Sequence, residues 1–187
     1  PFNKIIYDGA NYIFGDSGTG YIRGASNPTP FTAVNLGAEN KNFAGFDVDS
    51  EGIYYVAIPG ENTIKCFPTA CDSRLDFKSL RSPMDVEVGF FEAETTESLF
   101  VSDSGNGRIV RYILSGPNTG ITDEPLASGL SFPTGLVYYE KDPTQRFLFV
   151  ADTFNHQIRR INLMADQTIP IIVGDGDNDA CDNTAKY

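Results

Sequence analysis

A short motif that returns four times constrains the fold of this 187-residue chain more than any other feature. The clearest copies span residues 100–109 and 149–158, where apolar residues lead to an Asp, a turn with Asn and then an Ile. A third copy spans residues 14–22, and a degenerate fourth copy spans residues 55–64. Repeats with a period of roughly 40–50 residues are typical of propellers and solenoids.

Two landmarks fix the register of the repeats. We name the closing isoleucines the anchor isoleucines; they are Ile22, Ile64, Ile109 and Ile158, separated by 42, 45 and 49 residues. A Pro-x-small-apolar segment precedes each motif, clearest at residues 83–86 and 133–136 and weaker at residues 43–46 and 1–4. The extra length of the last two repeats falls in polar stretches at residues 91–97 and 140–145, where loops tolerate insertions.

Each repeat is predicted to form four short antiparallel strands, with the innermost strands near residues 2–8, 43–49, 83–88 and 133–138. In the third repeat the remaining strands are expected near residues 98–102, 108–113 and 125–128. Four strands per repeat describe a propeller blade. The sequence therefore predicts an all-β fold, a β-propeller with about four blades in this chain as part of a larger propeller, and one domain over residues 1–187. A compact ring of four blades is the alternative. The blades cover approximately residues 1–37, 38–80, 81–130 and 131–174, and residues 175–187 lead into a further blade or a tail.

The motif at residues 150–159 resembles the NHL repeat, whose blades run Pro-x-Gly-apolar and then apolar-Ala-Asp-Thr-x-Asn-x-x-Ile-Arg. The third copy matches that pattern at Asp103, Asn106 and Ile109, whereas the second departs from it with Ile58 in place of Asp. The resemblance covers nearly the whole chain and implies NHL-type blades, which usually close as six. Extracellular teneurin-like propellers, which mediate adhesion, are the nearest resemblance.

The repeated Asp and Asn side chains have two interpretations that are compatible. Asx side chains bond to nearby backbone N–H groups and so close turns. Propellers also present these turns on one face around the central channel, where loops on a rigid scaffold carry binding. The predicted binding residues are Asp16, Asp103, Asn106, Asp152, Asn155 and His156.

The charge of the chain disfavours two classes of partner. Twenty-five acidic and fourteen basic residues give a net charge of −11, which repels nucleic-acid backbones and anionic lipid headgroups. No apolar stretch approaches the roughly 20 residues of a membrane span. We therefore expect a protein partner or self-association, with neither nucleic-acid binding nor insertion into a membrane.

Three cysteines bear on the compartment. Cys66 and Cys71 bracket a Phe-Pro-Thr-Ala turn that allows them to meet in a disulfide, with two separate thiols as the alternative; the partner of Cys181 is left open. Disulfides are typical of oxidising compartments, so an extracellular or cell-surface location is favoured. The four-blade count and the opening Pro-Phe-Asn-Lys predict a piece of a larger protein.

Metal and catalytic chemistry find little support in the motifs. Only one His is present, which cannot supply the several histidines that hold zinc in NHL-like amidating lyases. Near the end of the chain Asp175, Asp177 and Asp179 alternate as carboxylates do in calcium loops, although the Gly and Glu of an EF-hand are missing. The alternative interpretation of this run is an ordinary interblade linker.

Two functions from different classes follow. The first is a non-catalytic binding or architectural module of a larger secreted or cell-surface protein, because the repeats carry no catalytic constellation and require no cofactor. The second is a calcium-dependent propeller hydrolase or lyase, in which acidic side chains hold a metal in the central channel. The first is the predicted function.

Overall fold

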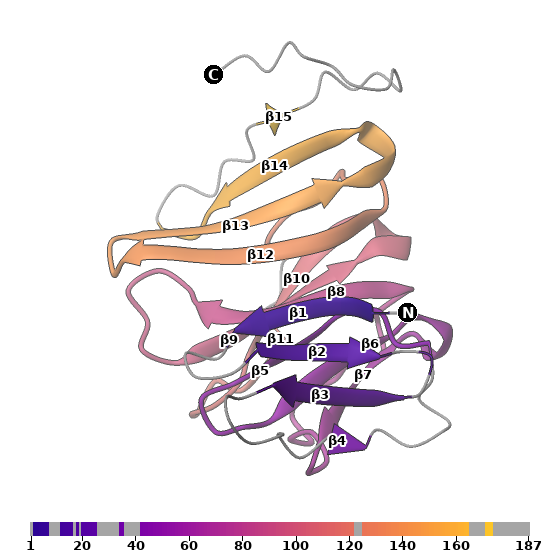
Figure 1. Ribbon diagram of the computed structural model, residues 1–187. Helices are drawn as coiled ribbons and strands as arrows, with labels where there is room; N and C mark the ends of the chain where they lie inside the picture. The colour runs from indigo at the N-terminus through magenta and orange to yellow at the C-terminus, as the bar shows by residue number, and fades with distance from the viewer. Residues whose placement is uncertain are drawn as a thin grey trace.

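The computed structural model describes residues 2–7, 12–16, 18, 20–25, 34–35, 42–121, 125–164 and 171–173. These residues form four antiparallel sheets, numbered here as blades 1 to 4 in chain order, which fan out in Figure 1. The only helical segments among them are single 3₁₀ turns. The predicted all-β fold is confirmed, and the four sheets fit a partial β-propeller.

Three blades have four strands and one has three. Blade 1 contains β1 (Phe2–Tyr7), β2 (Tyr12–Asp16), β3 (Tyr21–Ala25) and β4 (Val34–Asn35). Blade 2 contains β5 (Phe46–Val48), β6 (Tyr54–Ile58) and β7 (Thr63–Phe67). Blade 3 contains β8 (Pro83–Phe90), β9 (Glu97–Asp103), β10 (Arg108–Ile113) and β11 (Gly120–Ile121). Blade 4 contains β12 (Pro133–Asp142), β13 (Gln145–Asp152), β14 (Gln157–Asn162) and β15 (Ile171–Val173).

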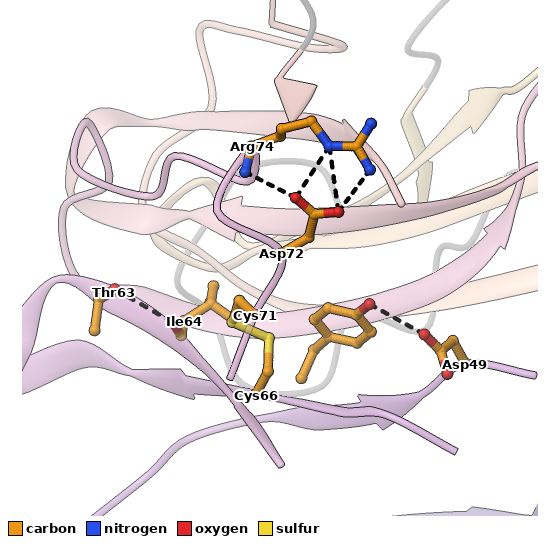
Figure 2. Close-up of a disulfide and its surroundings, with 8 residues drawn as sticks. Asp49, Thr63, Ile64, Cys66, Cys71, Asp72 and Arg74 are labelled. Atoms are coloured by element: carbon orange, nitrogen blue, oxygen red, sulfur yellow. Dashed lines mark hydrogen bonds and ion pairs between the residues drawn. A yellow bond between two sulfur atoms is a disulfide. The ribbon is translucent and has the colours of Figure 1, made fainter. Parts of the chain in front are cut away.

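The expectation of a fourth strand in every blade is wrong for blade 2. All of residues 68–82 are described, and none of them forms a strand. Pro68 cannot donate a backbone hydrogen bond, and the predicted Cys66–Cys71 disulfide is present with its Cα atoms 5.0 Å apart, so the chain turns back directly after β7 (Figure 2). Leu75 and Phe77 nevertheless fill the core where an outer strand would lie.

The outer strand of blade 3 differs in position from the prediction. β11 pairs with Tyr112 and Ile113 of β10, whereas residues 125–128 contribute only an isolated bridge from Ala127 to Ile109. The outer edge of β10 is thus paired by two separate short segments. In blade 4 the predicted insertion at residues 140–145 lengthens β12 and β13 into a long hairpin.

The core consists of three apolar clusters, each formed between two successive blades. The anchor isoleucines of the first three blades lie in these clusters, with Ile22 and Ile109 fully buried and Ile64 3% exposed. Burial of such a side chain contributes roughly 1.5–3 kcal/mol. The repeated Ile is therefore a packing residue between blades, which explains its return once per blade.

Candidate binding site

The turn after the second strand of blades 2, 3 and 4 has the same backbone geometry. A 3₁₀ turn follows β6 as η2 (Pro59–Glu61), β9 as η3 (Ser104–Asn106) and β13 as η4 (Thr153–Asn155). Each ends on a residue of positive φ, namely Asn62 (55°), Gly107 (63°) and His156 (52°). His156 thus occupies a left-handed position that favours Gly or Asn, and it is exposed. We call the surface carrying these turns the turn face.

Asp103 and Asp152 hold the turns of blades 3 and 4 from inside the protein. Asp152 is fully buried, and its carboxylate accepts hydrogen bonds from the Ser131 backbone N–H (2.6 Å), the Asn155 amide (2.9 Å) and Arg159 Nε (2.6 Å). We call this arrangement the turn latch. It ties the turn to the segment that enters the same blade, so the rigidity of the turn depends on a charge-assisted network.

Blade 3 repeats the turn latch with the same kinds of donor, although Arg108 aligns with Gln157 rather than with Arg159. The Asp103 carboxylate accepts from the Arg81 backbone N–H (2.7 Å), the Asn106 amide (2.8 Å) and Arg108 Nε (2.6 Å). Blade 2 has Ile58 at the Asp position, where the side chain is buried in the apolar core. There Asn62 Oδ1 accepts from the Ser82 backbone N–H instead (2.8 Å), which links the turn to blade 3.

The predicted binding residues therefore fall into two groups. Asp103 and Asp152 are enclosed by the latches, and Asp16 is half-buried at the end of β2. Asn106 and His156 are exposed on the turn face, and Asn155 is half-buried beside them. Because the amides of Asn106 and Asn155 bond to the latch carboxylates, the exposed groups best placed to contact a partner without a structural duty belong to His156 and its neighbours.

The turn face also carries an aromatic pair that was not predicted from the sequence. The rings of Phe132 and Phe154 stack with centroids 5.1 Å apart, and Phe154 is 64% exposed. The backbone N–H of Phe154 donates to the Ser131 carbonyl, as Gly105 donates to Arg81 in blade 3. The available signal was a large apolar residue at the variable position of the Asp-Thr-x-Asn motif, where a turn would expose it.

Phe132 holds this place with a backbone conformation that aromatic residues seldom adopt. Its φ is 52°, and the residues directly before the landmark segments of blades 2 and 3, Asn42 and Ser82, also have positive φ. The shared geometry belongs to the blade architecture, although a bulky residue bears more strain there than Asn. The scaffold therefore keeps the half-buried Phe132 beneath the exposed Phe154, at a position that stability alone disfavours.

A cavity of about 640 Å³ opens between the starts of the innermost strands, and we call it the turn-side cavity. It is bounded by Pro59 of η2, by Met84 and by Thr134. The hydroxyl groups of Thr134 and Thr153 lie 2.6 Å apart, so the wall of the cavity joins η4, which carries Phe154. The aromatic pair and the turn-side cavity are thus parts of one continuous face.

A group of charged side chains from the innermost strands of blades 1, 2 and 3 lies beside this cavity. We name Lys4, Asp47, Asp85 and Glu87 the axial cluster. Lys4 Nζ lies 2.9 Å from Asp85 Oδ1 and 2.6 Å from Glu87 Oε1, and it also donates to the Val86 carbonyl at 2.7 Å. Lys4 lines both the turn-side cavity and a second cavity of about 700 Å³ at the other ends of these strands. The cluster therefore separates the two cavities.

The carboxylates of the axial cluster also join neighbouring blades. Asp47 Oδ2 of β5 accepts the Val88 N–H of β8 at 2.7 Å. Asp85 Oδ2 and Glu87 Oε2 of β8 accept N–H groups of Leu136 and Tyr138 in β12, at 2.9 and 3.1 Å. Side chains thus supply hydrogen bonds between innermost strands, where the blades do not share a β-ladder.

Lys4 and Asp85 occupy the place of the glycine in the Pro-x-Gly landmark. Phe2 pairs with Asp16 as Pro83 pairs with Asp103, so the first landmark segment begins at Phe2, one residue later than predicted. Lys4 therefore aligns with Asp85, Gly45 and Gly135. A Cβ atom on Gly45 would lie 2.0 Å from Asp85 Oδ1. Gly45 is therefore required where it stands, because its missing side chain makes room for the Asp85 carboxylate.

Burial sets the ionisation of the cluster. Desolvation and the nearby Asp47 raise the pKa of Glu87 to about 7 against the opposing effect of Lys4. Burial likewise raises the pKa of Asp47. The carboxylates around Lys4 outweigh its desolvation and raise the pKa of its ammonium group. Lys4 consequently stays protonated and has no free electron pair for nucleophilic or base chemistry at neutral pH.

The metal prediction is addressed only in part by the structure. Asp175, Asp177 and Asp179 lie outside the described residues. Within the part of the chain that is described, no group of three or more His, Cys, Asp or Glu side chains is arranged to hold a metal ion. In the same residues no helix is long and apolar enough to span a membrane.

Comparisons with known proteins identify the fold. No family model matches this sequence, and no curated protein matches it. Among solved structures, a streptogramin B lyase superposes with a TM-score of 0.61 at 15% identity, covering 89% of this chain and 52% of the lyase. Virginiamycin B lyase from Staphylococcus aureus gives 0.61 at 12% identity, covering 91% and 55%. A catalytically inactive form of that lyase, solved with quinupristin, gives 0.57 at 13% identity.

These similarities establish a propeller fold and nothing finer, because the identities are so low. The chain spans about half the length of the solved propellers it matches. The activities and ligands of those proteins are consequently not assigned to this chain.

Proposed function

We propose that this chain is a non-catalytic recognition module of NHL type, part of a larger secreted or cell-surface protein, whose protein partner binds the turn face. The observation that carries the proposal is the exposed Phe154, stacked on Phe132 at the tip of a latched turn. A few residues carry most of the binding energy of a protein–protein interface, and aromatic side chains are enriched at such interfaces.

The latch makes the turn a suitable support for binding. A partner that meets a preordered loop loses less conformational entropy than one that must order it. The buried Asp152 carboxylate fixes both the entry segment at Ser131 and the turn at Asn155. The cost of ordering the aromatic pair is thereby met during folding rather than on binding.

Charge and compartment narrow the partner further. The net charge of −11 favours a partner with a basic or polar surface, mainly by increasing its association rate. The Cys66–Cys71 disulfide supports an oxidising, extracellular setting. A teneurin-like role in adhesion agrees with both the charge and the extracellular setting. In that role the partner can be a second copy of the same protein.

Binding is tested with a displayed library of random peptides selected on the immobilised chain, followed by calorimetry with the selected peptides. Replacing Phe154 by Ser should weaken binding at least tenfold, since truncating an aromatic hot spot costs about 2 kcal/mol or more. The control is Lys141→Ser at the exposed hairpin of the opposite end, which should leave Kd unchanged. Loss of binding by the Lys141 variant, with Phe154→Ser unaffected, would transfer the site to that hairpin.

A calcium-dependent hydrolase or lyase is the second candidate. Two observations favour it: the solved propellers that resemble this chain include lyases, and Glu87 has a pKa of about 7, within the range of a general base. Metal analysis of the purified protein separates the candidates. A stoichiometric divalent ion that is lost in an Asp85→Asn variant would support the enzyme and contradict the recognition module.

A further inference from the structure

The fourth anchor isoleucine differs from the other three. Ile22, Ile64 and Ile109 are at most 3% exposed because the following blade covers each of them, whereas Ile158 is 37% exposed. The same contrast appears beside it, where Phe100 of blade 3 is fully buried and its counterpart Phe149 in blade 4 is partly exposed. Blade 4 therefore carries the packing residues of a covered blade, and no described part of the chain forms a blade over them.

These residues form one continuous surface, which we call the trailing face; it consists of Val137, Tyr139, Phe149 and Ile158. Val137 pairs with Phe149 across β12 and β13, and Tyr139 lies two residues along β12 on the same side. Val137 is 58% and Tyr139 is 49% exposed. Three large apolar side chains exposed together on one sheet face mark an interaction surface.

The chemistry of the cover can be taken from the interface that already exists between blades 3 and 4. There Phe100 and Ile109 of blade 3 are buried with Leu136, Leu148 and Val150 of blade 4. These three side chains come from the first two strands of the covering blade. A cover for the trailing face therefore needs aliphatic side chains at the same three positions of an antiparallel blade.

Blade 1 does not supply this cover. Its Ile5 aligns with Leu136 by strand pairing, so it would face the trailing face in a closed ring of four blades. Ile5 is instead 68% exposed. Among the described residues, both ends of the blade series are consequently open. The chain also spans only about half of each solved propeller it matches.

We propose that the trailing face of blade 4 is an interblade interface, and that its occupant is a further blade of the same propeller carried by the intact polypeptide. The occupant presents aliphatic residues equivalent to Leu136, Leu148 and Val150. This inference rests on the proposed function only in treating the chain as part of a larger protein. It makes no use of the turn face or of Phe154.

Thiol labelling tests the proposal. Ile158→Cys is introduced, in a Cys181→Ser background, into the 187-residue chain and into the protein encoded by the complete reading frame. Lys141→Cys is the exposed reference and Ile109→Cys the buried one. In the 187-residue chain we expect the thiol introduced at position 158 to react with maleimide within about tenfold of the rate at position 141. In the complete protein it should be protected by about a hundredfold or more, because local opening then limits the reaction.

Three results would overturn the proposal. The first is equally fast labelling at position 158 in both proteins. The second is a complete reading frame that encodes no further blade. The third is protection within the 187-residue chain that increases with protein concentration, which would make a second copy the occupant. Val137→Cys repeats the measurement independently, and retention of peptide binding at the turn face by all of these variants separates this inference from the proposed function.

Discussion

Replacing Lys4 by Met tests the axial cluster most sharply. Met preserves much of the apolar stem while removing the ammonium group that faces Asp85, Glu87 and Asp47. The side chains of Lys4, Asp85 and Glu87 are only 10–14% exposed, so the remaining carboxylates would be buried without a counter-charge. Breaking a buried ion pair from one side costs about 3–5 kcal/mol, and we expect a loss of about 3 kcal/mol at pH 8 because some solvent reaches the cluster.

The loss should depend on pH with a defined sign. In the wild-type protein the pKa of Glu87 is raised from 4.5 to about 7, so its contribution to stability is fully present below pH 4.5 and is lost as pH rises to about 7. That shift corresponds to something on the order of 3 kcal/mol. Without Lys4 the pKa of Glu87 rises further, so protonation at pH 5 should relieve part of the damage that is complete at pH 8.

The assay is equilibrium urea unfolding between pH 5 and pH 8, followed by circular dichroism because the chain contains no Trp. Lys141→Met, at an exposed position, should change the free energy of unfolding by less than about 0.5 kcal/mol. A loss below about 1 kcal/mol for Lys4→Met, equal at both pH values, would refute the assigned role of the cluster.

Three further outcomes follow from the turns and the disulfide. His156→Gly should raise the free energy of unfolding by about 0.5–1 kcal/mol, because Gly adopts the left-handed conformation without strain; a loss in urea unfolding would contradict the backbone argument. Asp152→Ala should lower the free energy of unfolding by about 3 kcal/mol, because Arg159 and the Ser131 N–H lose their acceptor. A loss under about 1 kcal/mol would contradict the role of the turn latch. Opening the Cys66–Cys71 disulfide by paired Ser substitutions should cost about 2 kcal/mol for so short a loop, and an unchanged urea midpoint would show that it adds nothing to stability.

Most of the fold could be predicted from the repeated motif. Strands β8, β9 and β10 lie within two residues of their predicted places, because periodic apolar runs bounded by turn residues reflect local physics. The missing strand of blade 2 was not predictable in the same way. Leu75 and Phe77 pack as an outer strand would, but without the backbone pairing that a strand requires.

The site was predicted only in part, for a physical reason. The repeated Asp103 and Asp152 were found because every latch needs the same carboxylate at the same spacing. Lys4 and Glu87 escaped notice because their pairing depends on how separate blades face the channel, which no local pattern encodes. Phe154 stands at a position that the motif leaves variable, so repetition could not mark it.

Hydrogen–deuterium exchange of the chain, with and without a selected peptide, tests the central claim most directly. The account predicts slower exchange in the segments that form the turn face, around residues 59–62, 104–107, 131–134 and 153–156, and no change at the hairpin of residues 140–146. Protection confined to the hairpin or to the outer strands, with the turn segments unaffected, would contradict it.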